Sequence, residues 1–396
     1  MNYTIEKVTT LIGARRYGNT DANISFILTD SRSLCFPEET LFFAIRTERN
    51  DGHNYIPELY GRGVRNFVVE AIPENWATLY PNSNFLKVVG TLEALQRLAE
   101  RHRDEFLIPI IGITGSNGKT MVKEWLYQLL SPEMIVTRSP RSYNSQIGVP
   151  LSVWLLNENT QIGVFEAGIS KPGEMLALRD IIQPTIGVFT SLGTAHQENF
   201  PSLEAKCLEK LKLFHDTQAI VYSEDDQVLN DCISSKNYKG ESLNWSAKDV
   251  HAAFFIKSIE KKDIETTVSY VWKEKVEGQY KLPFIDDASV ENSITCAVVS
   301  LHLGIEPAHL AERMAKLEPV AMRLEVKEGQ HGCTLINDSY NSDYNSLDIA
   351  LDFMNRRPDH KGRKRTLILS DILQSGESGK ELYNKVAFLC EKRGVE

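Results

Sequence analysis

The 396-residue sequence predicts an α/β protein whose largest part is a doubly wound, mostly parallel sheet. Short apolar runs alternate with segments of helical periodicity, the pattern of parallel strands that helices cover on both faces. One apolar run, residues 108–113, leads directly into a glycine-rich turn and then into a helix. The length suits two or three domains, each able to bury its own core.

Three segments can be separated along the chain. Residues 1–105 combine short β-like runs, such as residues 66–70, with a closing helix over residues 92–103. A polar stretch with β-branched alternation, residues 252–283, predicts a small antiparallel insertion in the second segment. That second segment, residues 106–320, is the predicted parallel-sheet domain, with strands expected at residues 106–114, 163–166 and 185–190.

The third segment, residues 321–396, is expected to be a partial domain. Its pattern predicts a strand at residues 334–337, a helix at 344–356, a strand at 365–369 and a helix at 380–392. Two parallel strands make a poor independent sheet, since stable sheets usually have three or more strands. We therefore expect the chain to be a fragment of a longer protein.

The composition indicates which kinds of partner and environment do not suit this protein. The net charge is −9 and no long basic run occurs. This argues against nucleic acid as the main partner, because neutralising phosphates requires clustered Lys and Arg. No apolar run is long enough to span a bilayer, and residues 1–10 lack a signal-peptide pattern. The six cysteines contain no C-x-x-C pair, so reduced thiols in a cytoplasmic protein are expected.

The strongest local signal is the turn from Thr114 to Thr120, with the sequence TGSNGKT. A strand, a glycine turn, Lys-Thr and a helix in this order are typical of a loop that holds phosphates. Gly115 and Gly118 allow backbone N–H groups to approach phosphate oxygens. Lys119 can reach the β- and γ-phosphates, and the Thr120 hydroxyl can bind Mg²⁺. The alternative is a tight strand–helix turn with a surface lysine.

Glu166 is expected at the carboxyl end of a parallel strand, the edge where doubly wound sheets bind ligands. A carboxylate beside a phosphate loop is a natural Mg²⁺ ligand, because this ion prefers hard oxygen donors and shares them with phosphate. The alternative is an ordinary surface glutamate at the end of a strand.

The shortened loop resembles that of the Mur ligases and their folylpolyglutamate synthetase relatives, and further motifs extend the resemblance over nearly the whole chain. Residues 144–150 (NSQIGVP) are similar to the family's N-N-x-I-G-x-P stretch, with Ser145 in place of the second Asn. Residues 166–168 (EAG), followed by Gly173 and Glu174, resemble its E-x-G motif, and residues 190–196 (TSLGTAH) are similar to T-N-I-x-x-A-H, with Ser191 in place of the Asn. The resemblance implies an ATP-dependent, amide-forming ligase that uses Mg²⁺.

The resemblance also implies roles for single residues. His196 becomes a metal ligand, Asn292 lies near the adenine, and Arg323 is directed at the γ-phosphate. Lys210 stands fourteen positions after His196, where the family places a carbamylated lysine. A carbamate offers Mg²⁺ an oxygen anion, and its formation requires a depressed lysine pKa. The alternative is a solvated basic face, because Lys206 and Lys210 are four residues apart on one predicted helix.

Two stretches favour one branch of the family. Residues 29–32 (TDSR) and 51–53 (DGH) resemble the N-terminal UDP-sugar-binding domain of the tripeptide-forming and D-alanyl-D-alanine-adding branches. Residues 337–343 (NDSYNSD) resemble the D-D-x-Y-N-A-N-P motif of the D-alanyl-D-alanine-adding branch, in which Asp338 matches the acid that contacts the ribose. The alternative for this last stretch is a polar turn that caps the next helix.

The resemblance thus predicts a ligase that joins D-alanyl-D-alanine to UDP-N-acetylmuramoyl-tripeptide through an acyl phosphate. Two alternatives stay open: a ligase that adds Lys or diaminopimelate to the UDP-dipeptide, and an inactive nucleotide-binding fragment of a multifunctional protein, such as a fusion with alanine racemase. Residues 1–105 would bind the UDP-N-acetylmuramoyl substrate, residues 106–320 would bind ATP, and residues 321–396 would be part of a C-terminal, Rossmann-like ligase domain.

The expected site residues fall into four groups. The expected catalytic residues are Lys119, Lys210, His196 and Arg323. The expected metal ligands are Thr120, Glu166, His196 and Lys210 as a carbamate. The expected ATP-binding residues are Gly115, Ser116, Asn117, Gly118, Lys119, Thr120, Asn292, Arg323 and Asp338. The expected substrate-binding residues are Ser31, Arg32, Asp51, His53, Asn144, Tyr340 and Asn341.

Overall fold

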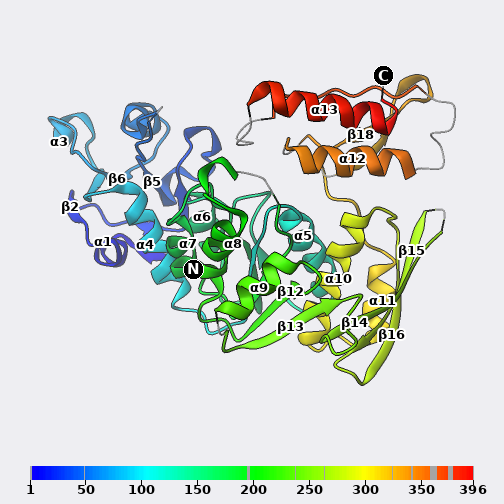
Figure 1. Ribbon diagram of the computed structural model, residues 1–396. Helices are drawn as coiled ribbons and strands as arrows, with labels where there is room; N and C mark the ends of the chain where they lie inside the picture. Colours follow the sequence, from blue (N-terminus) through cyan, green and yellow to red (C-terminus); the bar gives the residue numbers. More distant parts are fainter. Residues whose placement is uncertain are drawn as a thin grey trace. The chain divides into compact units, whose positions relative to one another are not determined.

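The computed structural model divides by its internal contacts into two units (Figure 1). Unit 1 comprises residues 1–108, 142–160 and 180–182, and unit 2 comprises residues 109–141, 161–179 and 183–396. The residues that the structure describes are 2–48, 50–193, 197–236, 238–262, 264–322, 324–339, 342–356, 364–372 and 378–395.

Unit 1 is built on a five-stranded sheet with the order β2-β7-β6-β5-β4, parallel except for β2. Alternate side chains of β5 point to opposite faces: Phe43 packs in the cluster formed with α1 and α4, and Phe42 in the cluster formed with α2. A further short pair, β1 and β3, is antiparallel. The elements are β1 (Tyr3–Thr4), α1 (Ile5–Ile12), β2 (Arg15–Tyr17), β3 (Asn23–Ile24), β4 (Phe26–Leu28), β5 (Thr40–Phe43), α2 (Ile56–Gly61), β6 (Asn66–Val69), α3 (Trp76–Leu79), β7 (Asn84–Lys87), α4 (Thr91–Arg103) and α6 (Gly148–Val153).

Unit 2 contains a nine-stranded sheet with the order β16-β15-β14-β13-β12-β11-β8-β10-β9. Neighbours from β9 to β14 are parallel, and β14, β15 and β16 form an antiparallel meander that extends the sheet at one edge. The predicted insertion is therefore confirmed. The strands are β8 (Ile110–Thr114), β9 (Val136–Arg138), β10 (Ile162–Glu166), β11 (Ile186–Phe189), β12 (Ala219–Ser223), β13 (Glu241–Ser246), β14 (Phe254–Lys262), β15 (Glu265–Trp272) and β16 (Val276–Leu282).

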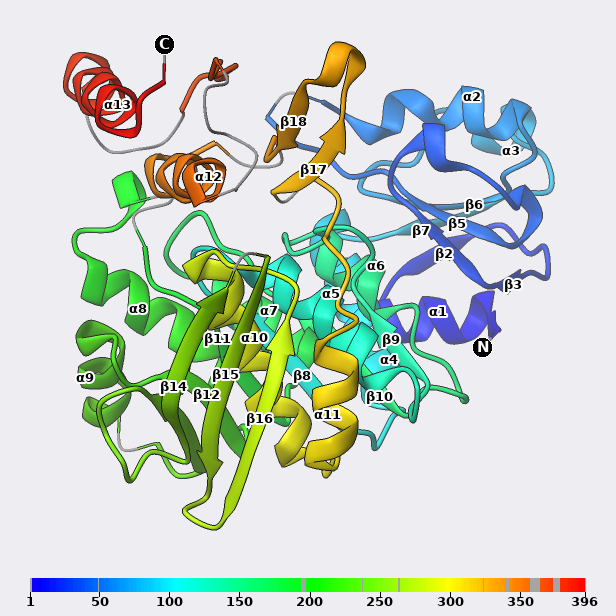
Figure 2. The ribbon, with the colours of Figure 1, turned by 90° about the vertical axis from the view of Figure 1, so that its right-hand side faces the viewer.

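Helices cover both faces of this sheet (Figure 2), so the predicted doubly wound α/β class is confirmed. Ile111 and Ile113 of β8 join one apolar core with residues of α5, α10 and α11. The opposite face is lined by glycines: a Cβ at Gly187 would meet the ring of Phe214, and one at Gly112 would meet Pro184. The helical segments are α5 (Lys119–Leu130), α7 (Glu174–Ile182), α8 (Leu203–Leu211), η5 (Lys212–Phe214), α9 (Gln227–Ser235), α10 (Asp287–His302) and α11 (Pro307–Met314).

The last part of unit 2 departs from one sequence prediction. β18 (Thr334–Asn337) and the helices α12 (Tyr344–Arg356) and α13 (Gly379–Arg393) lie where they were expected. The strand expected at residues 365–369 is wrong, because these residues have no regular secondary structure and Ile368 is 92% exposed. β18 instead pairs antiparallel with β17 (Glu325–Glu328), and no described strand pairs with residues 365–369. A strand without a partner leaves its backbone groups to water.

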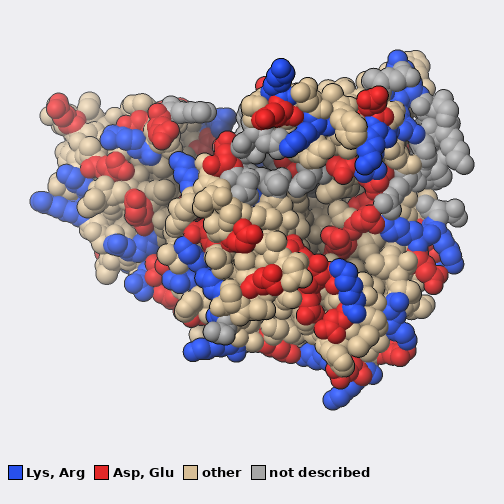
Figure 3. All heavy atoms as spheres, viewed as in Figure 1, with Lys and Arg blue, Asp and Glu red and all other residues tan. Residues whose placement is uncertain are grey.

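None of the helices that the structure describes is long and apolar enough to cross a membrane. On the face drawn in Figure 3, acidic and basic side chains are interspersed.

Candidate nucleotide and metal site

The predicted phosphate loop connects β8 to α5, at the carboxyl edge of the parallel strands. Gly115 and Gly118 have φ angles of 144° and 84°, in the region that favours glycine. Neither position has room for a Cβ, which would lie 2.1 Å from Thr190 Oγ1 at Gly115 and 2.4 Å from Asn292 Oδ1 at Gly118. The apolar face predicted for α5 is buried, and this packing fixes the position of the helix. The backbone N–H groups of its first turn are therefore held in place beside the loop.

A second turn, residues 190–193, braces the loop from the end of the neighbouring strand β11. Ser116 N–H donates to the Ser191 carbonyl at 2.7 Å, and Asn117 N–H donates to Ser191 Oγ at 3.2 Å. The Thr190 hydroxyl donates to the Asn117 carbonyl at 2.5 Å. The hydroxyl of Ser191 thus does part of the bracing where the family motif has Asn.

Three lysines converge on this loop. Lys119 Nζ donates to the carbonyls of Gly115 and Ser116, at 2.8 and 2.9 Å. Lys210 Nζ donates to the same Gly115 carbonyl at 3.1 Å, and Lys206 Nζ donates to the Gly193 carbonyl. Lys206 and Lys210 are 1% and 3% exposed. The alternative of a solvated basic face on α8 is therefore wrong.

Burial and mutual repulsion change the acidity of these lysines. Burial, and then the charges of Lys119 and Lys206, hold the pKa of Lys210 well below its usual value. Burial and the charge of Lys119 lower the pKa of Lys206 to about 8, against the opposing effect of Asp343. A cluster of positive charges that water cannot solvate favours an anionic ligand.

Glu166 ends β10 and is fully buried beside the loop, so it is not the surface glutamate of the alternative interpretation. The Thr120 hydroxyl donates to Glu166 Oε2 at 3.2 Å. Lys123 Nζ lies 3.1 Å from Glu166 Oε1, and this lysine also has no exposed surface. Lys123 further contacts Glu124 and the Arg141 carbonyl.

This donor set fits Mg²⁺. The Thr120 hydroxyl and Glu166 carboxylate are adjacent hard oxygen donors beside a phosphate loop, which is how proteins usually hold this ion. Lys210 would add a third oxygen donor only as a carbamate, because its ammonium would repel the ion. In the described part of the chain, no group of three or more His, Cys, Asp or Glu side chains could hold a metal alone.

Two further expected nucleotide-binding residues lie close to the loop. Asn292 of α10 lies against Gly118, and its Nδ2 donates to Met121 Sδ at 3.4 Å. Asp338 follows β18, and its Oδ1 accepts from the Leu324 N–H at 3.3 Å. Within unit 2, a cavity of about 70 Å³ is lined by Asn117, Gly118, Thr120, Met121, Ala288, Asn292, Leu324, Asp338, Ser346 and Ile349.

The expected substrate-binding residues of unit 1 form separate local networks. Asp51 accepts from the His53 N–H at 3.0 Å and contacts His53 Nδ1 at 2.6 Å, while His53 Nε2 accepts from the Glu70 N–H. Burial alone would raise the pKa of Asp51, but hydrogen bonds from His53 and Arg46 outweigh it and lower the pKa to about 2.

The remaining expected residues of unit 1 differ in exposure. Ser31 is buried, and its carbonyl accepts from Arg62 Nη1 at 2.7 Å. Arg32 is exposed and pairs with Asp30 at 2.6 Å. Asn144 is half-buried, and its backbone N–H donates to the Ser142 carbonyl.

Four expected site residues lie outside the described residues: His196, Arg323, Tyr340 and Asn341. Their predicted roles stay predictions. The alternative for residues 337–343 has structural support, since Asp343 accepts from the Ser346 N–H at 2.9 Å at the start of α12. The residue of this stretch that caps the helix is therefore Asp343.

Sequence reasoning missed Lys123 and Ser191. Lys123 stands four residues after Lys119 on α5, and this helical spacing was the only signal that could have placed it beside the site. Ser191 was treated only as a departure from the family motif, because its bracing contacts depend on the fold of two distant segments.

Comparison with known proteins assigns the family. Residues 113–300 match a family described as the Mur ligase middle domain, and residues 23–103 match the Mur ligase family, catalytic domain. The UDP-N-acetylmuramoyl-tripeptide–D-alanyl-D-alanine ligase of Borreliella burgdorferi is 30% identical over 339 residues, covering 83% of this chain and 71% of that protein. The chain belongs to the Mur ligase family.

Solved structures support the Mur ligase fold. MurF from Acinetobacter baumannii has a TM-score of 0.85 at 21% identity and covers 99% of this chain and 84% of its own. The MurF ligase from Thermotoga maritima, in complex with ADP, has a TM-score of 0.77 at 23% identity and covers 92% and 81%. The predicted family and its enzyme class, ATP-dependent amide-forming ligases, are confirmed.

The relative from Borreliella burgdorferi carries the name of the D-alanyl-D-alanine-adding branch, the branch that the motif of residues 337–343 predicted. The family matches cover residues 23–103 and 113–300 separately. The domain boundaries at residues 105 and 320, and a fusion with alanine racemase, stay predictions.

Proposed function

We propose that this Mur ligase uses ATP to join D-alanyl-D-alanine to UDP-N-acetylmuramoyl-tripeptide, as a cytoplasmic step of peptidoglycan precursor synthesis. The main structural support is a pair of lysines at one phosphate loop: Lys119, which is half-buried, and Lys206, which is buried, bring positive charge that favours a polyanion there. The family relationship supports the reaction class, and the name of the Borreliella relative supports the substrates.

The proposed reaction has two steps. The terminal carboxylate of the tripeptide attacks the γ-phosphorus of ATP, its new O–P bond replaces the bond to the β-phosphate oxygen, and ADP leaves. The amine of D-alanyl-D-alanine then attacks the carbonyl carbon of the acyl phosphate, inorganic phosphate leaves and the amine loses a proton. An anion attacks a polyanion in the first step, so Lys119 and Arg323 are proposed to neutralise the developing charge.

Mg²⁺ would neutralise charge on the β- and γ-phosphates when bound. Its proposed ligands are Thr120, Glu166, His196 and Lys210 as a carbamate. The neutral Lys210 amine would add to CO₂ and release a proton, and its depressed pKa supports this step because only the neutral amine reacts. We expect a carbamate signal by NMR with ¹³C-bicarbonate, absent in Lys210→Ala and retained in the neighbouring Lys212→Ala.

The direct test is ADP release by the full chain with Mg²⁺, ATP, UDP-N-acetylmuramoyl-tripeptide and D-alanyl-D-alanine. Sustained release over many turnovers should require both the acceptor and the amine, because without the amine the reaction stops at the acyl phosphate. Lys119→Ala should slow it by about 10²- to 10³-fold, the loss typical of a group that stabilises developing charge. Lys248→Ala is the matched control, because Lys248 is exposed and far along the chain from the loop.

Other results would support the alternatives. Turnover only with the UDP-dipeptide and Lys or diaminopimelate would assign the chain to the tripeptide-forming branch. ADP binding without turnover on any acceptor would support the inactive nucleotide-binding fragment.

A further inference from the structure

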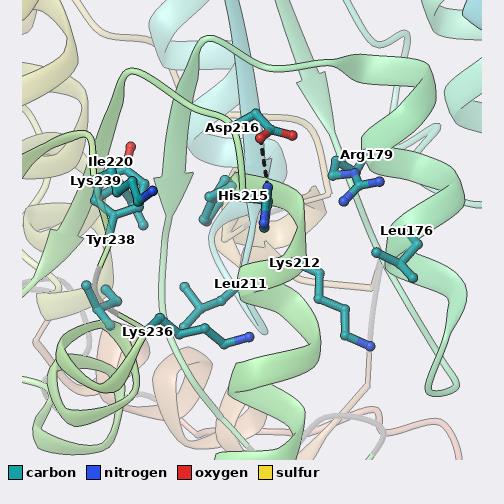
Figure 4. Close-up of a pocket in the computed structure, with 12 residues that line it drawn as sticks. Leu176, Arg179, Leu211, Lys212, His215, Asp216, Ile220, Lys236, Tyr238 and Lys239 are labelled. Carbon is teal, nitrogen blue, oxygen red and sulfur yellow. Dashed lines mark hydrogen bonds and ion pairs between the residues drawn. The ribbon is translucent and has the colours of Figure 1, made fainter.

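Unit 2 contains a second cavity, of about 390 Å³ (Figure 4). It is lined by residues of α7, the end of α8, η5 and the loop after it, β12, α9 and the segment between α9 and β13. Its size falls in the range of small-molecule sites, which is about 300–1,000 Å³. No residue expected in the nucleotide, metal or substrate site lines it.

The lining combines an apolar wall with cations. Phe214, Ile220 and Ile233 are buried, whereas Leu176 is 40% exposed. Four lining residues are Lys or Arg and one is Asp, in a chain whose net charge is −9. Figure 4 shows these cations coming from different sides of the cavity: Arg179, Lys212, Lys236 and Lys239.

Two carboxylates lie at or near the cavity, and each contacts a neighbouring side chain. Asp216 pairs with His215 at 2.7 Å, and Glu209, which does not line the cavity, pairs with Lys212 at 2.5 Å. Lys236 and Lys239 have no carboxylate partner among the described residues. Cations beside an apolar wall attract the charged group of an anion. The uncharged part of the same ligand can then pack against the apolar wall.

The topology separates this cavity from the nucleotide site. Ile220 is the second residue of β12, and Lys239 precedes β13, so the cavity lies at the amino ends of parallel strands. The phosphate loop follows the carboxyl end of β8 in the same parallel sheet. The two sites therefore lie at opposite edges of the sheet.

We propose that this cavity binds a small organic anion, a flat apolar body that carries a phosphomonoester. The guanidinium of Arg179 and the two unpaired lysines would hold the phosphate, because a guanidinium matches its geometry and ammonium groups add point charge. The ring would lie against Phe214, Ile220 and Leu176. This inference rests on the cavity and its charges and is independent of the proposed ligase reaction.

The test is a calorimetric titration of the full chain with 1-naphthyl phosphate, in the presence of excess ADP and Mg²⁺ so that the phosphate loop is occupied. We expect saturable 1:1 binding with a Kd below about 1 mM. The double variant Lys236→Glu/Lys239→Glu should weaken binding at least tenfold. The charge-matched control Lys248→Glu/Lys275→Glu, at exposed lysines outside the cavity, should stay within twofold.

Two further probes test the two halves of the ligand. Inorganic phosphate alone and 1-naphthol alone should each bind at least tenfold more weakly than the ester. The inference is overturned if either binds as tightly as the ester, if the control variant loses as much affinity as the cavity variant, or if the wild-type chain shows no saturable binding.

Discussion

The Lys123 ammonium shows how a single buried charge supports the candidate metal site. It lies 3.1 Å from Glu166 and 3.0 Å from Glu124, and neither it nor Glu166 has exposed surface. Taking both charges out of water is costly, and their attraction repays that cost only while both are present. Lys123 thus holds the Glu166 carboxylate in place beside Thr120.

We predict that Lys123→Met lowers the free energy of unfolding by about 3–5 kcal/mol, the usual cost of stranding one partner of a buried ion pair. Urea unfolding measures it. The double variant Lys123→Met/Glu166→Gln should lose less than Lys123→Met, because no charge is then left alone. A matched change at an exposed lysine, Lys248→Met, should stay within about 0.5 kcal/mol. A loss below 1 kcal/mol in Lys123→Met would refute the role.

His102 gives the stability of unit 1 a pH dependence. It is 1% exposed, its Nδ1 contacts the Tyr3 hydroxyl at 2.8 Å, and its Nε2 contacts the Leu156 carbonyl at 3.0 Å. Burial lowers its pKa from 6.5 to about 4. Below pH 6.5, His102 therefore binds a proton in the unfolded chain but stays neutral in the folded chain. The free energy of unfolding falls as the pH falls toward 4.

The expected loss between pH 7.5 and pH 4 is on the order of 3 kcal/mol, from a shift of about 2.5 pKa units at 1.36 kcal/mol each. The urea midpoint of unit 1, followed as a function of pH, checks it. His102→Gln keeps a donor and an acceptor but cannot titrate, so its midpoint should fall less steeply with acid. Equal slopes for both proteins would show that other groups carry the pH dependence.

At the scale of elements, two glycines at helix starts allow a matched comparison. Gly118 begins α5 at φ 84°, and Gly173 begins α7 at φ 89°. An alanine at either position is strained by about 1–2 kcal/mol. Only at Gly118 would the new Cβ also meet Asn292, since nothing lies within 4 Å of a Cβ at Gly173.

We therefore predict similar backbone strain but different binding. Gly118→Ala should weaken ADP binding at least tenfold, because it moves Asn292 or the loop itself. Gly173→Ala should keep ADP affinity within twofold while losing about 1–2 kcal/mol of stability. Calorimetry with ADP and thermal unfolding separate the two effects. Unchanged ADP affinity in Gly118→Ala would contradict the placement of the nucleotide at this loop.

Elements were predictable where the sequence pattern was strong. The apolar spacing of α5 and the short buried strands around it gave their positions to within a few residues. The strand at residues 365–369 failed, because an apolar run forms a strand only if another strand is there to pair with it. The burial of Lys206 and Lys210 could not be predicted from the sequence either, because helical spacing shows which residues share a face but not what covers that face.

At the scale of the whole molecule, the family and the reaction class followed from the order and spacing of several motifs, whereas no single motif decided them. The contacts within the site could not be predicted in the same way. Lys123 and Ser191 act through segments distant in sequence, and local patterns do not report such contacts. Four expected site residues, His196, Arg323, Tyr340 and Asn341, lie outside the described residues.

The central claim is that the acceptor carboxylate attacks ATP at the lysine-lined phosphate loop. The most direct measurement uses UDP-N-acetylmuramoyl-tripeptide labelled with ¹⁸O in its terminal carboxylate, with mass analysis of the phosphate released in the presence of D-alanyl-D-alanine. Attack through the carboxylate predicts one ¹⁸O atom in each phosphate formed by the wild-type chain, and labelled phosphate that accumulates about 10²- to 10³-fold more slowly with Lys119→Ala. Phosphate released at the same rate without ¹⁸O would contradict the account, because ATP would then have been hydrolysed by water.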